Sequence, residues 1–547
     1  MTDPVHIYHS SSSNEAGVRN RSRSSVTLNS IGGENNNSEV YPQVESEVLG
    51  HIMTQSNIVY RSNASLNSSV TSIAETEQHY IPSIANRQSS QEARAPDDSQ
   101  SILSKVLTAA MPNLKQSKTS YWSPRLQDKR HQVVLRFLLT NMVLICFILT
   151  IFVLFWGATY NTAHYYYRTK ILAVIQDDIV SPDASILPMT AIFPALIAQL
   201  PGTWHVFNTS SFQDKYNVKS TEEINAKIIS LVYDEKYFIS FNVQPNVTER
   251  LYDSLTTNDS PAFNSTDLFE SVYESGRDPI NIKSFMLPLI TSLQTSFQEY
   301  YTNTYLPGFL SNITLPTPVN STKLSFATIM KFNFLDYRPF YDRILYGPAQ
   351  VGAIYTMTLT VFQFLIYGPV HARMARILKP RHALIYRWSI TCFTAFILSL
   401  FICTISAIYH VDFTLAFGKA GFIVYWMSTW LFMFAVAGAN ENVIGLIFLY
   451  RPQFTGIWVL SFVILNLAPT LFTMALDSPF YRYGYMMPLH NAVDIYRVIF
   501  LNVSKRKMGR NYGVLCAWIV LNGCLSIFIL KYIRKVVERR EAAMSTK

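Results

Sequence analysis

The fold is decided by the stretch FLLTNMVLICFILTIFVLFW, residues 137–156, which contains no Asp, Glu, Lys, Arg or His. About 20 apolar residues in a helix cross a hydrocarbon core of roughly 30 Å. Five more apolar runs of 19 to 23 residues follow it, and they are equally free of charge. The six runs therefore predict a polytopic α-helical membrane protein. The later runs are residues 349–370, 388–408, 420–439, 454–476 and 512–530.

The composition fits this class. Charged residues make up 15% of the 547 residues, whereas soluble domains carry about 25%. All five cysteines lie inside apolar runs, which excludes a disulfide scaffold. The net charge of +9 lies mainly beside the runs, where it acts as a topology signal, so we expect no nucleic-acid partner. Motifs for a phosphate loop, a zinc protease, a dithiol or a serine hydrolase do not occur, and we expect neither an enzyme nor a cofactor or metal site.

The runs also define the predicted domains. Residues 1–132 are rich in Ser and Asn and carry 12 basic and 12 acidic residues, which predicts a disordered cytoplasmic tail. Residues 157–348 separate the first span from the second and are numerous enough to build a core without disulfides. The other five spans lie within residues 349–530, and a basic tail, residues 531–547, follows them. The predicted order is one span, an extracytoplasmic domain (the ectodomain) and five spans.

Local patterns predict a mixed α/β ectodomain. Ser220 and Asn246 each begin a capping-box pattern, with Glu three residues later. Apolar residues alternate over residues 237–243, which favours a strand, and recur at helical spacing over residues 285–300.

Lysine and arginine placement gives the predicted orientation. Six basic residues precede or enter the first span and two follow it closely, so the positive-inside rule places the N-terminal tail in the cytoplasm. Loop 371–387 has five basic residues and no acid, and the C-terminal tail is also basic, so both are expected in the cytoplasm. Residues 477–511 should lie outside, yet they carry six basic and two acidic residues. An alternative topology adds or removes a crossing near residues 486–501.

Modification signals occur on both predicted sides of the membrane. The ectodomain has six N-x-S/T sequons and the tail has four, at the same density, so sequons do not establish the topology. In the tail, Ser22, Ser24 and Ser25 follow arginines in a pattern that basic-directed kinases accept, which predicts phosphorylation. The candidate glycosylation sites are Asn208, Asn246, Asn264, Asn312 and Asn320.

Polar residues near the apolar runs are candidates for a substrate or ion pathway. Asn440, Glu441 and Asn442 interrupt an apolar stretch. A carboxylate at membrane depth is costly and is a functional hypothesis by default. The alternative ends the span at residue 439 and places Glu441 at the cytosolic interface.

A second group of candidates lies in DSPFYRYGYMMPLHNAVDIYRVIF, residues 477–500. Asp494 and Arg497 are three residues apart and can share one helix face. The dense aromatic and Met content predicts either a helix in the outer-leaflet interface or an amphipathic surface helix. The pathway candidates here are Pro488, His490, Asp494 and Arg497.

The layout and the carboxyl-terminal sequence resemble the fungal nitrosoguanidine-resistance membrane proteins. The resemblance covers residues 125–535. The layout is also similar to the phage-infection-protein group and to type-2 membrane domains of ABC exporters, whose last outer loop carries short helices that dip into the outer leaflet. The residues that carry the resemblance are Met487, Pro488, Asn491, Ala492, Arg497, GRNYGVL at 509–515 and Trp518.

The resemblance implies resistance to a small alkylating toxin, with export as the mechanism. The toxin and membrane lipid are then the expected partners, together with a separate ATPase or a second copy of the chain. Two alternatives stay open: a non-transporting protein that modulates lipid distribution or other transporters, and a proton-coupled exporter with Glu441 as carrier. The expected location is the plasma membrane, with a secretory-pathway or vacuolar membrane as the alternative.

Overall fold

The residues that the computed structural model describes belong to one compact unit. The predicted disordered tail, with the candidate phosphorylation sites Ser22, Ser24 and Ser25, lies outside the described residues. The described residues are 122–124, 127–177, 187–257, 259–313 and 320–545.

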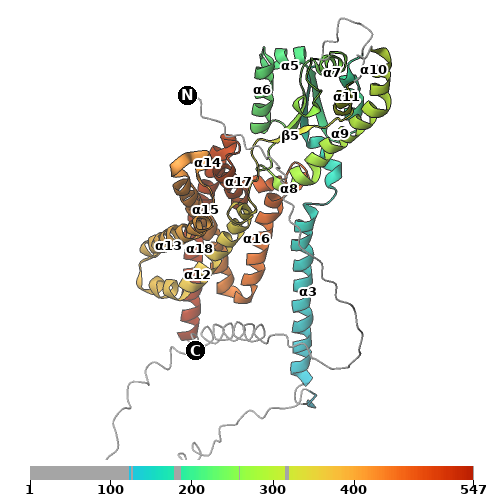
Figure 1. Cartoon of the computed structure of the whole chain (residues 1–547). Helices are drawn as coiled ribbons and strands as arrows, with labels where there is room; N and C mark the ends of the chain where they lie inside the picture. Colours follow the sequence, from blue (N-terminus) through green and yellow to red (C-terminus); the bar gives the residue numbers. More distant parts are fainter. Residues whose placement is uncertain (1–121, 125–126, 178–186, 258, 314–319, 546–547) are drawn as a thin grey trace, which may run out of the picture. The chain divides into compact units, whose positions relative to one another are not determined.

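Six helical segments of the described chain are long and apolar enough to cross a membrane (Figure 1). They occur as one span, the ectodomain and five spans, which confirms the predicted polytopic fold. The first span is exposed along nearly all of its length and packs against α16. The helices of the spans are α3 (Gln127–Gly157), α12 (Gly352–Ile377), α13 (Pro380–Ile408), α15 (Gly421–Tyr450), α16 (Thr455–Leu471) and α18 (Met508–Ser545).

Helix α15 is the centre of the five-helix bundle. It is apolar all round, as expected for a buried helix, and it packs against α12, α13, α16 and α18. A Cβ atom at Gly438 would lie 2.9 Å from the Cβ atom of Asn522, so glycine permits close approach of α15 and α18. The basic tail continues α18 as far as Ser545, and Arg540 donates a hydrogen bond to the carbonyl of Leu449 near the end of α15.

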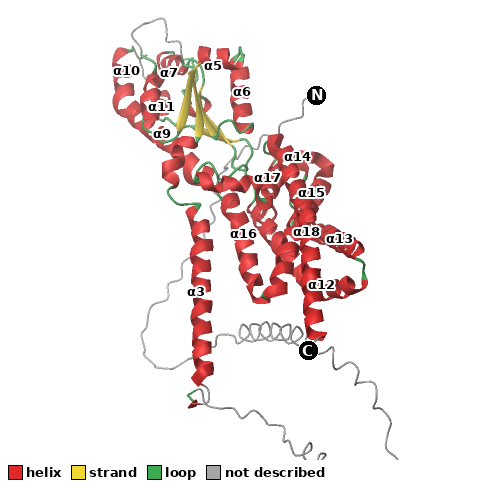
Figure 2. Cartoon of the chain, turned by 180° about the vertical axis from the view of Figure 1, so that it is seen from behind, coloured by secondary structure: helices red, strands yellow, loops and turns green. Residues whose placement is uncertain are grey.

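The ectodomain is built on a five-stranded mixed sheet in the order β2-β1-β3-β4-β5. Figure 2 shows its strands gathered among helices. β1 pairs in parallel with β2 and β3, β3 and β4 are antiparallel, and β4 and β5 are parallel. Helices cover both faces, so β1 and β3 are largely buried, and β1 reads as a near-continuous apolar run. The strands are β1 (Lys170–Ile175), β2 (Thr203–Asn208), β3 (Ile239–Val243), β4 (Phe269–Tyr273) and β5 (Asn333–Asp336).

Two hydrophobic clusters lie on opposite sides of β1. Ile171 and Ala173 pack with residues of α4, α7 and α9, whereas Leu172 and Val174 pack with residues of α5 and α6. The alternation of side chains along a strand accounts for this division. The helices are α4 (Phe193–Ala198), α5 (Thr209–Tyr216), α6 (Thr221–Tyr233), α7 (Val247–Thr256), α8 (Pro279–Asn281), α9 (Leu287–Tyr300), α10 (Leu306–Asn312) and α11 (Ser321–Ala327).

The local predictions for the ectodomain are confirmed in three cases and wrong in one. The predicted strand and helix are β3 and α9, and the Ser220 hydroxyl caps α6 by accepting a hydrogen bond from the N–H of Glu223. Asn246 does not cap α7, because its backbone is left-handed (φ 57°) and its side chain makes no capping bond. The Asp177 carboxylate takes this role by accepting hydrogen bonds from the N–H and the hydroxyl of Thr248.

The segment between α16 and α18 corrects the expectation of a surface helix. It forms η11 (Pro479–Met486) and α17 (Pro488–Leu501), and neither is a candidate span, so the crossing near residues 486–501 is not present. Eleven of the 14 residues of α17 are buried. The helix packs against α15, α16, α18 and the short α14 (Thr414–Phe417). The expectation of an amphipathic surface helix is therefore wrong, whereas the helix in the outer-leaflet interface stays a prediction.

Candidate functional site

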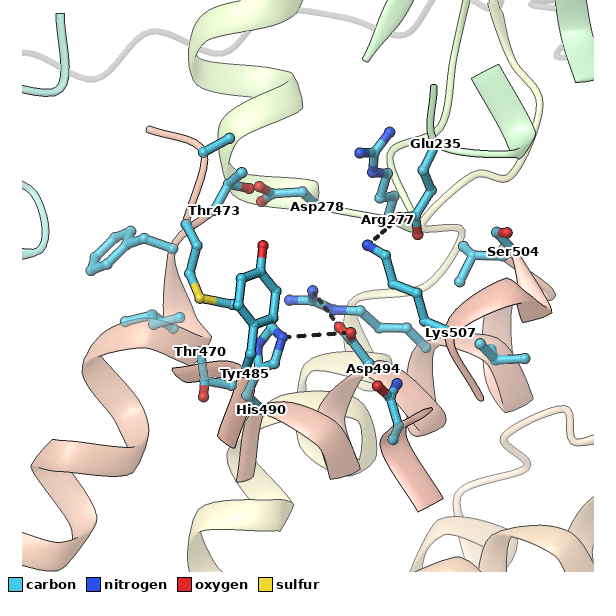
Figure 3. Close-up of a pocket in the computed structure, with 18 of the residues that line it drawn as sticks. Glu235, Arg277, Asp278, Thr470, Thr473, Tyr485, His490, Asp494, Ser504 and Lys507 are labelled. Carbon is cyan, nitrogen blue, oxygen red and sulfur yellow. Dashed lines mark ion pairs between the residues drawn. The ribbon is translucent and has the colours of Figure 1, made fainter. Parts of the chain in front are cut away.

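A cavity of about 250 Å³ lies between the ectodomain and the end of the five-helix bundle (Figure 3). We call it the interface cavity. Its walls come from the turns after α6 and before α8, from residues 470–475, from α17 and from the start of α18. Its ionisable lining residues are Glu235, Arg277, Asp278, Tyr485, His490, Asp494, Arg497 and Lys507.

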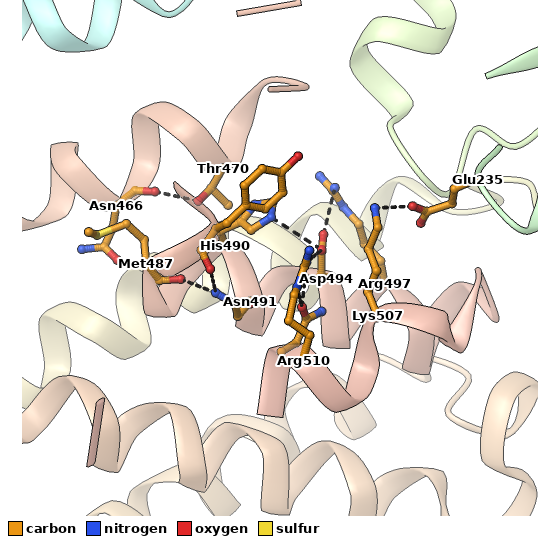
Figure 4. A network of polar contacts seen from close by, with 12 residues as sticks. Glu235, Asn466, Thr470, Met487, His490, Asn491, Asp494, Arg497, Lys507 and Arg510 are labelled. Atoms are coloured by element: carbon orange, nitrogen blue, oxygen red, sulfur yellow. Dashed lines mark hydrogen bonds and ion pairs between the residues drawn. The ribbon is translucent and has the colours of Figure 1, made fainter. Parts of the chain in front are cut away.

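Asp494 is the centre of a charge cluster on α17 and α18 (Figure 4). The spacing of His490, Asp494 and Arg497 places all three side chains on one face of α17. The Asp494 carboxylate lies 3.6 Å from Nε2 of His490 and 3.9 Å from Nη1 of Arg497. Arg510 on α18 brings its Nη2 atom to 3.8 Å from the same carboxylate. The structure thus confirms the shared face predicted for Asp494 and Arg497.

The cluster separates the protonation states of its two acid–base residues. Burial alone would raise the pKa of Asp494, but His490 and the cations of α17 and α18 hold that pKa below its ordinary value. Burial lowers the pKa of His490, and the same cations lower it further against the opposing effect of Asp494. At neutral pH the carboxylate is charged and the imidazole is neutral. Nε2 of His490 is buried and has no hydrogen-bond partner among the described residues.

An ion pair between Glu235 and Lys507 connects the ectodomain to the start of α18. Glu235 follows α6 with a left-handed backbone (φ 58°). Its N–H bonds to the carbonyl of Val232, and the N–H of Lys236 bonds to that of Leu231, which is the Schellman pattern of helix ends. Glycine is the usual residue at this position, because a left-handed backbone costs other residues about 1 kcal/mol. A glutamate here brings a carboxylate to Lys507.

Arg277 forms the other cationic part of the ectodomain wall. Its guanidinium group stacks 4.4 Å from the centre of the Phe238 ring and donates a hydrogen bond to the carbonyl of Tyr237. Within the described chain, Arg277 has no carboxylate oxygen within 4 Å. The nearby Glu274 is buried, and burial raises its pKa to about 8 even though Arg277 and Arg338 oppose the rise. Glu274 is therefore uncharged at neutral pH.

The predicted pathway residues divide between two places. Pro488 begins α17, and His490, Asp494 and Arg497 line the interface cavity. Asn440 and Asn442 instead tie α15 to its neighbours. Asn440 donates to the hydroxyl of Thr360 and accepts from the indole of Trp458, and Asn442 donates to the carbonyl of Asn522. Buried amides of this kind join membrane helices.

Glu441 lies within α15, which continues to Tyr450, so the helix does not end at residue 439. The position of Glu441 at the cytosolic interface stays a prediction. Nη2 of Arg387 lies 3.3 Å from the Glu441 carboxylate, and the hydroxyl of Thr391 donates to it. The side chain lines a small cavity of about 20 Å³ between α13, α15 and α18. The structure therefore does not bring Glu441 to the interface cavity.

Sequence reasoning missed several residues of the interface cavity. Lys507 and Arg510 belong to the basic residues of loop 477–511 that the topology rule does not explain. The structure explains them, because they lie beside Glu235 and Asp494. Glu235 and the adjacent pair Arg277 and Asp278 come from two separate parts of the ectodomain sequence and carry no local signal.

The candidate glycosylation sites lie in the ectodomain and stay predictions. Asn208 and Asn320 cap α5 and α11, and Asn264 bonds Asp267 through its amide nitrogen. Asn246 precedes α7, and Asn312 is exposed at the end of α10.

Comparison with known proteins gives the family. Residues 140–524 match the family model described as a protein of unknown function (DUF3533). An uncharacterised endoplasmic reticulum membrane protein of Saccharomyces cerevisiae is 46% identical over 433 residues, which cover 78% of this chain and 85% of that relative. No solved structure matches the chain. The chain is an integral, multi-pass membrane protein and belongs to the DUF3533 family.

Proposed function

We propose that this protein confers resistance to a small toxic compound of the nitrosoguanidine type and acts as an export permease. The observation that carries the proposal is the interface cavity, which places charged groups and the Tyr485 ring at the end of the five-helix bundle. Ligand sites combine an apolar or aromatic wall with a few placed polar groups. The resemblance to the nitrosoguanidine-resistance proteins suggests the class of compound.

Export against a gradient needs an energy source. The sequence contains no phosphate loop, so the proposal includes a separate ATPase or an ion gradient. The protein would bind the compound and change conformation without reacting with it.

The test is the time course of a labelled alkylating toxin in cells that lack, contain or overproduce the protein. We expect the half-time of toxin loss to shorten in proportion to the amount of protein. Equal retention in all three cell types would exclude export.

A non-transporting role is the second candidate, in which the protein modulates lipid distribution or other transporters. The packing of the bundle favours it, because α17 is buried beneath the interface cavity and the amides of Asn440 and Asn442 join α15 to α12, α16 and α18. Purified protein that moves the toxin across liposomes without any other protein would exclude this role.

Proton-coupled export is the third candidate, with Glu441 as the carrier. The observation that favours it is the position of Glu441 inside α15, beside the small cavity and in an ion pair with Arg387. The variant Glu441→Gln should then abolish resistance, whereas Asp412→Asn in an exposed loop should not. Full resistance with Glu441→Gln would exclude this mechanism.

The proposed location is the plasma membrane, with an internal membrane as the alternative. The name of the yeast relative places that protein in the endoplasmic reticulum. Imaging of the tagged full chain at its natural level distinguishes the two locations.

A further inference from the structure

We infer that the interface cavity is a binding site for an oxyanion, a phosphate or carboxylate group, held by Arg277, Arg497 and Lys507. The inference rests on the proposed function in one respect, that the cavity takes a ligand. It adds a ligand other than the nitrosoguanidine-type toxin, which carries neither a phosphate nor a carboxylate group.

The first argument is the charge balance around Asp494. Two guanidinium groups, those of Arg497 and Arg510, lie 3.9 and 3.8 Å from this one carboxylate. Lys507 and Glu235 neutralise each other in their ion pair. Because His490 is neutral, the group formed by Asp494, Arg497 and Arg510 keeps one positive charge in excess. Arg510 is 41% exposed and does not line the cavity, whose own lining carries three cations and three carboxylates. An anionic ligand would balance the excess charge of the Asp494 group.

The second argument is that Arg277 has unused donors. A guanidinium group carries five N–H donors. Among the described residues, the Arg277 side chain donates one hydrogen bond, to the carbonyl of Tyr237. Glu274 does not neutralise Arg277 at neutral pH, because its buried carboxyl is protonated. Arg277 can therefore bind a phosphate or carboxylate in the bidentate geometry that guanidinium groups favour.

The third argument is that the remaining acidic wall residue is already engaged. Asp278 caps α8, and its two oxygens accept hydrogen bonds of 3.1 and 2.8 Å from the backbone and side chain of Asn281. These hydrogen bonds fix the carboxylate on α8 and leave its negative charge, which offsets one of the three cations of the lining. Figure 3 shows Tyr485, His490 and Lys507 around the same space, and the buried Nε2 of His490 still lacks a partner. A neutral imidazole can donate one hydrogen bond to an oxyanion.

The size of the cavity fits this class. A water occupies about 30 Å³, so a cavity of about 250 Å³ holds several waters. This volume is larger than one phosphate group needs. The ligand is either a free small molecule or the headgroup of a lipid, since both present the same oxyanion.

The experiment uses the full chain in nanodiscs of neutral phosphatidylcholine. Inorganic phosphate and acetate are titrated at constant ionic strength against chloride, with calorimetry and the thermal unfolding midpoint as readouts. We expect saturable binding of phosphate or acetate that weakens at least tenfold in Arg277→Gln and in Arg497→Gln. The matched control is Arg482→Gln, which removes an exposed cation of η11 and should bind like the wild type.

Arg277→Gln is the decisive variant, because Arg277 has no ion pair in the described chain whose loss would unfold the protein. A second arm uses nanodiscs that contain phosphatidic acid. If a lipid headgroup occupies the site, phosphatidic acid raises the unfolding midpoint of the wild type and not of Arg277→Gln. If a free anion occupies the site, soluble phosphate or acetate raises the unfolding midpoint of the wild type, and not of Arg277→Gln, in neutral nanodiscs.

The absence of a variant-sensitive effect in both arms would overturn the inference. Binding without toxin efflux would leave the anion site standing and remove the proposed export function. Toxin efflux without anion binding would remove the anion site and leave the proposed export function standing.

Discussion

Replacement of Glu274 by glutamine is a quantitative test of the electrostatics beneath the interface cavity. Glu274 is 1% exposed, and neither carboxylate oxygen has a hydrogen-bond partner among the described residues. Glutamine has nearly the same shape as the protonated carboxyl group but cannot ionise. The variant therefore removes the pH dependence that this residue gives to stability.

The magnitude follows from the pKa values. Burial raises the pKa of Glu274 from 4.5 to about 8, so between these pH values the folded protein holds a proton that the unfolded chain has released. Stability is then highest below pH 4.5 and falls as pH rises towards 8, by about 1.4 kcal/mol for each pH unit. From pH 5.5 to pH 7.5 the wild type should lose about 3 kcal/mol that the variant keeps.

The assay is the thermal unfolding midpoint of the full chain at pH 5.5 and pH 7.5. At 2–4 °C per kcal/mol for a domain of roughly 150–250 residues, the midpoint of Glu274→Gln relative to the wild type should rise by about 6–12 °C between the two pH values. The matched control is Glu299→Gln, which changes an exposed carboxylate of α9 and should show no such rise. The same difference between variant and wild type at both pH values would refute the reasoning.

Three further predictions concern the cavity wall and the ectodomain. Asp494→Asn leaves two guanidinium groups without their carboxylate, so we expect a loss of about 3 kcal/mol in unfolding free energy; an unchanged midpoint in denaturant would contradict this. Glu235→Gln and Glu235→Gly both remove the ion pair with Lys507. Glycine also relieves the strain of the left-handed backbone, so the glycine variant should be more stable than the glutamine variant by about 1 kcal/mol. Thermal unfolding of the pair measures the order, and the opposite order would argue against the helix-end geometry. Ser220→Ala removes the cap of α6 and should cost about 1 kcal/mol, seen as faster hydrogen exchange in the first turn of α6, whereas unchanged exchange would show that the cap is not needed.

The spans could be predicted from sequence because their signal is local. An uncharged run such as residues 137–156 must be a helix to satisfy its backbone within lipid, whatever surrounds it. The same is true of the Ser220 cap and of the strand and helix predicted in the ectodomain. Each depends on neighbours within a few residues.

The burial of α17 and the interface cavity could not be predicted in this way. The polar face of α17 is covered by the ectodomain and α18, so the helix is not exposed to solvent as its amphipathic composition alone would predict. Glu235, Arg277 and Asp494 are far apart in the chain, and only the tertiary fold brings them to one cavity. The positive charge of loop 477–511 was the one signal in the sequence that pointed to the cavity. The acidic residues that pair with it could not be identified from the sequence.

The most direct test of the account is the rate of labelled-toxin efflux in cells that make Asp494→Asn or Asp214→Asn at the wild-type level in the same membrane. Asp494 lines the interface cavity, whereas Asp214 is exposed on α5 and outside it. The account predicts that Asp494→Asn lowers the efflux rate at least tenfold and that Asp214→Asn leaves it unchanged. Equal rates for the two variants and the wild type would contradict the claim that the interface cavity is the functional site.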